Sequence, residues 1–191
     1  MTMVRSREPN VMLRRLLLAV VILVLLGGLP FFVQIAGFQF LPSTNWVANS
    51  LWLALASGAV AAIFLSVIII RGRKRDGLNR RAVGYLFLIA FSPLFFGALG
   101  TSAVFSGGPL VYTAIFGKPA ELSYKVKRAG SSGRKCRNKI DLIGLPILND
   151  RLCGFPKDFV DSLRPGQTIV VAGKGSPFGI FVDTARLSDE P

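Results

Sequence analysis

Residues 16–36 read LLLAVVILVLLGGLPFFVQIA and contain no charged side chain. A helix needs about 20 apolar residues to cross a hydrocarbon core about 30 Å thick, and this stretch meets that length. Two further uncharged stretches follow at residues 48–70 and 82–105. A chain of 191 residues is too short to bury three such helices inside a soluble core. The sequence therefore predicts three transmembrane helices, within a membrane region that comprises residues 1–107.

The charges are concentrated away from these stretches. The chain has 23 Lys and Arg residues against 10 Asp and Glu residues, a net charge of +13, yet only 17% of its residues are charged. Ten basic and two acidic residues precede residue 110, and thirteen basic and eight acidic residues follow it. A strongly basic chain normally raises nucleic acid as a partner. Here the division of the charges predicts instead a membrane protein with one small polar domain at residues 108–191.

The connections between the helices predict the orientation. The chain before the first span is basic, the connection GFQFLPSTNW is uncharged, and the connection RGRKRDGLNRR is basic again. Lys and Arg accumulate on the cytoplasmic side of membrane proteins. We expect a bacterial inner-membrane protein with a cytoplasmic N-terminus, and a C-terminal domain in the periplasm or outside the cell. The residues that set this topology are Arg14, Arg15, Arg71, Arg73, Lys74, Arg75, Arg80 and Arg81.

The predicted spans carry no Asp, Glu, Lys, Arg or His, and the chain has no histidine at all. Pumps and ion-coupled transporters rely on ionisable groups inside the membrane, so the sequence argues against those classes. The second span carries Ala54, Gly58 and Ala62 at four-residue spacing. Small residues at this spacing let two helices approach closely in lipid. This face could bind a second copy of the chain or another protein. Alternatively, it packs against the other helices of the same chain, which is the interpretation that we prefer.

The C-terminal 80 or so residues predict a small, mainly antiparallel β domain, either a sheet or a partly open barrel. ELSYKVK at residues 121–127 alternates apolar and polar residues, as a half-buried strand does. NKIDLIG and PILNDRLC predict two more strands that turn at Gly144 and Leu145, and QTIVVAG and FGIFVDTARL predict a further pair. PKDFVDSL predicts one short helix.

Both cysteines of the chain, Cys136 and Cys153, lie in this domain. A thiol among basic residues is either a reactive thiolate, part of an anion-binding loop, or half of a disulfide. Outside the cytoplasm a disulfide is the expected state of two cysteines in one small domain. A hairpin turn at Gly144 and Leu145 would also place the two opposite each other, so we predict a disulfide. Two thiols without histidine do not complete a metal site, and neither a metal nor a cofactor is expected.

One acid-free run of basic residues stands out as a candidate surface for an anionic partner, either an acidic protein or lipid head groups. The alternative is a solvated loop without a ligand. Nucleic acid is not expected, because the run faces away from the cytoplasm. Its members are Lys125, Lys127, Arg128, Arg134, Lys135, Arg137 and Lys139.

The motif GKPAEL, the two cysteines around a hairpin and a late SPFG are together similar to a set of small bacterial inner-membrane proteins with a two-cysteine C-terminal domain. This resemblance implies a location in the envelope and no activity.

The sequence offers no set of catalytic parts, because a nucleophile needs a base beside it and the chain has no histidine. We therefore expect a non-enzymatic protein whose outer domain binds a partner, of an immunity type or an accessory type. The alternative is a structural or regulatory subunit of a larger envelope complex, and a lesser one is an enzyme with an unrecognised site. The expected partners are the lipid bilayer and a protein of the membrane or periplasm. Self-association into a homo-oligomer is left open.

Overall fold

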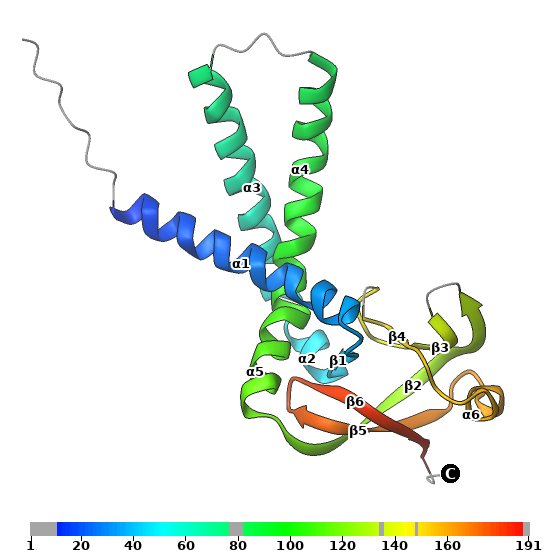
Figure 1. The fold of residues 1–191 in the computed structure, drawn as a ribbon. Coiled ribbons are helices and arrows are strands. Elements are labelled where there is room, and N and C mark those ends of the chain that lie inside the picture. Colours follow the sequence, from blue (N-terminus) through cyan, green and yellow to red (C-terminus); the bar gives the residue numbers. More distant parts are fainter. Residues whose placement is uncertain (1–10, 77–81, 134–135, 148, 189–191) are drawn as a thin grey trace, which may run out of the picture.

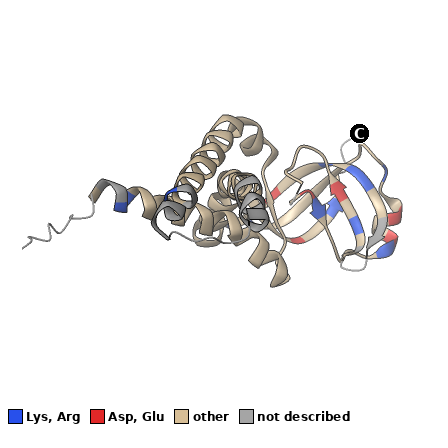
Figure 2. Cartoon of the chain, turned by 90° about the horizontal axis from the view of Figure 1, so that it is seen from above, with Lys and Arg blue, Asp and Glu red and all other residues tan. Residues whose placement is uncertain are grey.

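A computed structural model describes residues 11–76, 82–133, 136–147 and 149–188. Long helices form one part of the molecule, and a curled antiparallel sheet forms the other (Figure 1). Seen from above, most of the acidic and basic residues that the structure describes lie on the sheet, and few lie on the described parts of the long helices (Figure 2). The apolar helices and the charged sheet thus form separate parts of the molecule.

The structure contains three helical segments long and apolar enough to cross a membrane. The first lies in α1 (Val11–Ile35) and covers Arg14–Ile35. The second, in α3 (Leu51–Asp76), covers Leu51–Ile68. The third covers Phe91–Phe116 and runs through α4 (Ala82–Ser102), the π-helical turn η1 (Ala103–Gly107) and α5 (Gly108–Phe116). This third segment continues past residue 105, where the sequence pattern predicted its end.

Helices α3 and α4 pack against each other through small residues. Ala54 is fully buried, and a Cβ atom added to Gly58 would lie 2.8 Å from the carbonyl oxygen of Gly97. Ala62 approaches Gly97 from the next turn of α3. The Ser57 hydroxyl donates a hydrogen bond of 2.8 Å to the Gly100 carbonyl. The small-residue face of the second span thus lies against the third span of the same chain.

Helix α1 crosses α4 and η1 at two glycines. A Cβ atom on Gly27 would collide with the carbonyl of Leu99, and one on Gly107 would collide with the carbonyl of Leu26. The two backbones meet directly, which small residues at a helix crossing permit. The crossing places α1 at a steep inclination to the α3–α4 pair (Figure 1).

The sheet contains six strands in the order β1-β6-β5-β2-β3-β4, with every neighbouring pair antiparallel. The long strand β2 (Lys118–Gly133) pairs with β5 (Thr168–Ser176) through its first half and with β3 (Cys136–Leu142) through its second half. The remaining strands are β6 (Gly179–Leu187), β4 (Arg151–Leu152) and β1 (Phe40–Pro42), and α6 (Lys157–Ser162) covers one end. The result is a curled half-barrel.

The half-barrel encloses an apolar core, to which β2 contributes Tyr124 and Val126 while Lys125 and Lys127 face solvent. The alternation predicted for ELSYKVK is therefore found. Other buried members of this core are Leu41, Ile140, Leu142, Leu152, Val160, Ile169, Val171 and Ile180.

Two features of the sheet differ from the sequence prediction. Strand β3 ends at Leu142 and β4 has only two residues, so the described residues 143–147 and 149–150 belong to a loop rather than to a tight hairpin. Gly144 takes a positive φ of 81°, and Pro146 has no N–H to offer a ladder. The second difference is β1, which comes from the connection between the first two helices, although that connection shows no strand pattern of its own.

Gly27 and Gly28 offer a matched test of the α1 crossing. We expect Gly27→Ala to destabilise the protein in detergent by about 1–3 kcal/mol, because the added methyl overpacks the contact with Leu99. In Gly28→Ala the added methyl would contact only the Phe32 ring, at 3.8 Å. The melting temperature of this variant should therefore equal or exceed that of the wild type. Equal stability of the two variants would show that the backbones do not meet at Gly27.

Candidate binding surface at the open seam of the half-barrel

The turn between β5 and β6 attaches the sheet to the helices. The Phe178 ring at this turn lies edge-on to Trp46 (4.8 Å between ring centroids) and to Tyr112 (5.0 Å). The Phe178 carbonyl accepts a hydrogen bond of 2.8 Å from the Ser43 amide. The hydroxyl oxygens of Thr113 and Ser176 lie 2.6 Å apart beside this contact. The motif SPFG, which the sequence offered only as part of a resemblance, is therefore the point at which the sheet meets the helices.

Trp46 also explains the π-helical turn. The Gly108 amide donates a hydrogen bond to the carbonyl of Ala103, five residues earlier in the chain. If this π-helical pattern continued, the Val104 carbonyl would accept a hydrogen bond from the amide of residue 109. Residue 109 is proline, which has no N–H. Trp46 belongs to α2 (Thr44–Asn49), and its indole Nε1–H donates a hydrogen bond of 3.0 Å to the Val104 carbonyl in place of the missing amide.

Strand β1 is held from inside the half-barrel by Tyr124. Its hydroxyl donates to the Pro42 carbonyl at 3.2 Å, and the ring is 2% exposed. Burial raises the pKa of Tyr124 far above its ordinary value. The phenol therefore stays a hydrogen-bond donor throughout the neutral range.

Gln39 closes one end of the seam between the two edges of the sheet. Its side-chain Nε2 donates to the Cys153 carbonyl at 2.7 Å, and the Cys153 amide donates to its Oε1 at 3.0 Å. The amide side chain thereby reproduces the paired hydrogen bonds that a neighbouring strand would make. Gln39 directly precedes β1 and Cys153 directly follows β4, and β1 and β4 are the two edge strands of the sheet. The side chain of Gln39 therefore connects the two edges.

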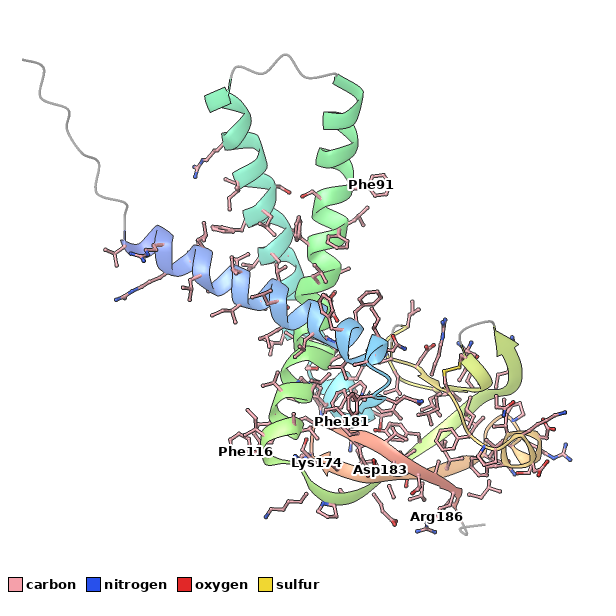
Figure 3. The ribbon with its side chains drawn as sticks, viewed as in Figure 1. Phe91, Phe116, Lys174, Phe181, Asp183 and Arg186 are labelled. Atoms are coloured by element: carbon pink, nitrogen blue, oxygen red, sulfur yellow. A yellow bond between two sulfur atoms is a disulfide. The ribbon has the colours of Figure 1, made fainter. Side chains whose placement is uncertain are left out.

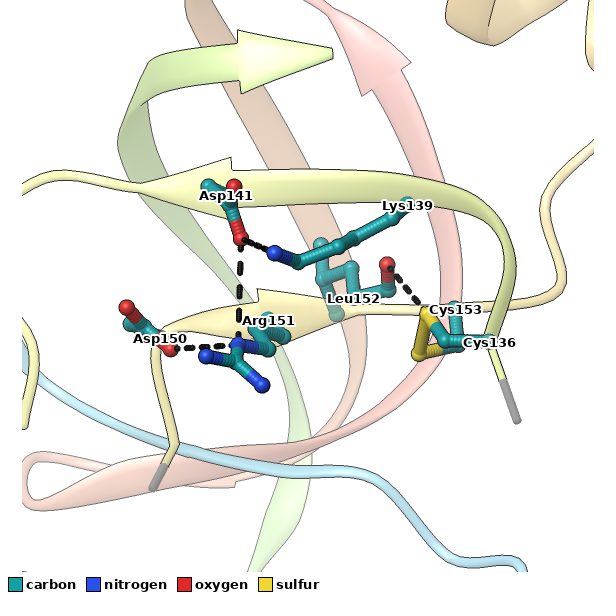
Figure 4. A network of polar contacts seen from close by, with 7 residues as sticks. All are labelled: Cys136, Lys139, Asp141, Asp150, Arg151, Leu152 and Cys153. Carbon is teal, nitrogen blue, oxygen red and sulfur yellow. Dashed lines mark hydrogen bonds and ion pairs between the residues drawn. A yellow bond between two sulfur atoms is a disulfide. The ribbon is translucent and has the colours of Figure 1, made fainter. Parts of the chain in front are cut away.

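Cys136 and Cys153 lie at disulfide distance, with 1.99 Å between their Sγ atoms (Figure 4). The register differs from the predicted hairpin, because Ile140 pairs with Leu152 and this places residue 136 across from residue 156. The cysteines nevertheless meet, and their Cα atoms are 5.2 Å apart. Asn138, which takes a positive φ of 52°, lies between Cys136 and this pairing and interrupts the regular strand.

The basic run predicted from the sequence is divided by the fold. Lys125, Lys127 and Arg128 are exposed on β2. Lys139 instead forms an ion pair of 2.7 Å with Asp141, next to Arg151 and Asp150 (Figure 4). Arg134 and Lys135 lie outside the described residues, and only the backbone of Arg137 is described.

Two basic side chains on the outer face of the sheet have polar partners close by. Lys174 lies near the end of α5 (Figure 3) and donates to the Ala114 carbonyl at 2.7 Å. Arg186 lies farther along β6 and pairs with Glu121 at 3.0 Å. Among the described residues, no group of three His, Cys, Asp or Glu side chains is placed to hold a metal ion.

Beyond Gln39 the seam is open, and it forms a groove. One wall is β6, and the other is the segment after β4. The lining residues are Gln39, Cys153, Gly154, Phe155, Pro156, Val182, Asp183, Thr184 and Ala185. The second wall is held in place by the disulfide and by a hydrogen bond of 2.8 Å from the Asn138 side chain to the Phe155 carbonyl.

The β6 wall presents free backbone groups. Strand β1 pairs with β6 only at Gly179, Ile180 and Phe181, and Val182 donates the last bond to the Gln39 carbonyl. The Ser188 amide donates to Thr168 of β5, so in an antiparallel ladder the N–H and C=O groups of Ala185 and Leu187 point away from β5. No other strand in the described part of the chain pairs with this edge.

Comparisons with protein-family models, with curated proteins and with solved structures find no match to the chain. Its candidate sites therefore follow from its own geometry. Sequence reasoning identified the two cysteines and the basic run, but it missed Gln39 and the β6 edge. The only available signal was the unusual polarity of Gln39 between Phe38 and Phe40.

Replacing Gln39 tests the closure of the seam. We expect Gln39→Ala to lower the free energy of unfolding by about 1–3 kcal/mol, because it leaves two backbone groups of Cys153 without partners. Gln34→Ala, at an exposed position in the last turns of α1, is the control and should leave thermal unfolding unchanged. If the two variants unfold alike, Gln39 does not join the two edges.

The cysteine pair predicts that protein alkylated without a reductant carries no label. The double variant Cys136→Ser, Cys153→Ser should lose about 3 kcal/mol of stability, because the bridge closes a loop of 18 residues in the unfolded chain. Denaturant titration of the oxidised protein and of the variant measures this loss. Ready alkylation of unreduced protein would contradict the pairing.

Proposed function

We propose that the chain is a non-enzymatic protein anchored in the bacterial inner membrane, whose sheet domain lies on the periplasmic or outer side and captures a protein partner. Capture occurs at the open seam, where an extended segment of the partner adds to the edge of β6. The observation that carries this proposal is the free β6 edge beside a groove with a fixed second wall.

The membrane placement is supported by the exposed surface of the helices. Large apolar side chains point outward along all three segments, among them Leu25, Trp52 and Leu94. Contiguous apolar surface of this extent is disfavoured in water. Arg14, Arg15 and Arg71 lie exposed at the helix ends farthest from the sheet, which agrees with a cytoplasmic location for those ends. Arg73, Lys74 and Arg75 follow in α3 without described side chains, and Arg80 and Arg81 lie outside the described residues.

The capture mode is supported by the chemistry of the groove. Strand addition supplies affinity through main-chain hydrogen bonds, and pockets for alternate side chains supply specificity. Ala185 and Leu187 offer the backbone groups, while Phe155, Pro156 and Val182 offer an apolar lining. A groove of this composition favours an extended segment with small or apolar side chains on one face. Immunity proteins against toxins that act in the envelope, and accessory proteins of envelope enzymes, are the classes in which such capture would serve.

A second candidate is a subunit of a larger envelope complex, joined through its helices. The splayed position of α1 favours it, because Leu17, Leu18 and Val21 in the first half of α1 remain exposed. In that case the helices alone would hold the complex together, and the groove would contribute nothing. An enzyme with an unrecognised site remains the third and weakest candidate.

Ala185 provides the variant that separates the first two candidates. Its N–H points away from β5, so Ala185→Pro removes a donor from the free edge without breaking the β5–β6 ladder. Ala185→Thr keeps that N–H and is the matched control. Each variant is purified in mild detergent, and the proteins that co-purify with it are quantified by mass spectrometry. We expect these proteins to be recovered with the Thr variant and to be lost with the Pro variant. Equal recovery with both, or with the helices alone, would contradict capture at the seam and favour the subunit role.

A further inference from the structure

The loop between β3 and β4 exposes apolar side chains that the core of the sheet domain does not use. Ile147 is 78% exposed and Ile143 is 46% exposed, and they are the only large hydrophobic residues of the described sheet strands and their connecting loops with such exposure. From Leu142 to Asn149 the sequence LIGLPILN has no charged residue. An exposed apolar loop on an otherwise polar domain marks a contact with an apolar partner.

The position of the loop identifies that partner. A Cβ atom added to Gly144 would lie 3.6 Å from the methyl group of Thr44, at the start of α2. Asn149 and Arg151, at the other end of the loop, line one hollow together with Pro30, Val33 and Phe38 at the end of α1. The loop therefore lies level with the last turns of α1, as the yellow trace beside the blue helix shows (Figure 1).

The end of α1 beside the loop is itself apolar and exposed. Phe31, Phe32, Ile35 and Phe38 all direct most of their surface outward. Under the proposed function this end of α1 lies at the outer boundary of the bilayer. The loop then continues the apolar surface of α1 onto the sheet domain, at the same depth.

The backbone of the loop suits an apolar environment. The Ile143 amide donates to the Lys125 carbonyl, the Asn149 amide donates to the Pro146 carbonyl, and Pro146 has no N–H. Ile147 is the first residue within the turn that Pro146 and Asn149 close. The amides of Ile143 and Asn149 would therefore enter the lipid already hydrogen-bonded, which lowers the cost of their desolvation.

The charges beneath the loop suit the head-group region. Arg151 follows the loop with a side chain that is 48% exposed, and it pairs with Asp150 at 3.3 Å. Arg side chains keep their charged end at the polar boundary while their stem lies along apolar surface. The arrangement from Ile147 to Arg151 thus runs from apolar to charged, as the outer boundary of a bilayer does.

We propose that the β3–β4 loop inserts Ile143 and Ile147 into the outer leaflet and fixes the tilt of the half-barrel on the membrane. This inference rests on the proposed membrane location and adds a second point of contact to it.

Depth-dependent quenching tests the insertion. The full chain carries a single added cysteine at Ile147→Cys, labelled with an environment-sensitive fluorophore after the native disulfide has formed. Vesicles of phosphatidylethanolamine and phosphatidylglycerol contain a lipid with a spin label high on its acyl chain. Leu25→Cys, on the exposed face of α1, reports insertion of the helices. Asp161→Cys, exposed on α6, reports the aqueous side.

We expect the labels at positions 25 and 147 to lose most of their fluorescence, and the label at position 161 to keep it. If position 25 is quenched and position 147 behaves like position 161, the loop does not insert, although the membrane location stands. If position 25 is also unquenched, the proposed membrane location fails and the insertion fails with it. An unchanged melting temperature would show that the substitution at position 147 does not impair folding. If it does impair folding, the measurement is repeated with Ile143→Cys.

Discussion

The structure depends on one short strand contributed by the connection between the first two helices. Phe40–Pro42 forms β1, pairs with β6, and accepts the hydrogen bond of the buried Tyr124 hydroxyl. Gln39, the preceding residue, joins the other edge of the sheet through Cys153. Without β1 the sheet would lose its backbone pairing with this connection and would rely on contacts such as those of the Phe178 turn and the end of α5. With it, the helices and the half-barrel share a continuous set of hydrogen bonds.

This attachment also sets where the domain is open. Because β1 has three residues and β6 has nine, the outer half of β6 has no neighbouring described strand on the side away from β5. Natural proteins usually cover or charge such an edge, since it is a template for pairing with another chain. Here the opposite wall is anchored by the disulfide and by Asn138. A preformed groove of this kind lowers the ordering cost of binding an extended segment, which is the physical basis of the proposed capture.

Much of this architecture could be predicted from the sequence, for identifiable reasons. Uncharged stretches of more than 20 residues indicate the three apolar helices, and the alternation around Tyr124 indicates β2. The prediction of a tight hairpin at Gly144 was wrong, because Pro146 has no N–H for the hydrogen-bond ladder that such a hairpin needs. The apolar pattern of the two segments does not reveal how their strands are paired. Strand β1 and the role of Gln39 could not be predicted, because three residues carry no periodic signal and their partners lie more than 100 positions away. The continuation of the third helix to Phe116 depends on the Trp46 indole, which lies 58 positions away from Val104.

Hydrogen exchange at the amide of Ser43 tests the central claim most directly. This amide donates to the Phe178 carbonyl at 2.8 Å, at the point where β1 enters α2. Mass spectrometry of the protein in lipid nanodiscs can follow a peptide that spans residues 40–46. We expect this peptide to exchange as slowly as peptides from β5 in the centre of the sheet. Exchange at the rate of an unstructured connection would show that the first two helices are joined by a free loop, and that the half-barrel is not built on it.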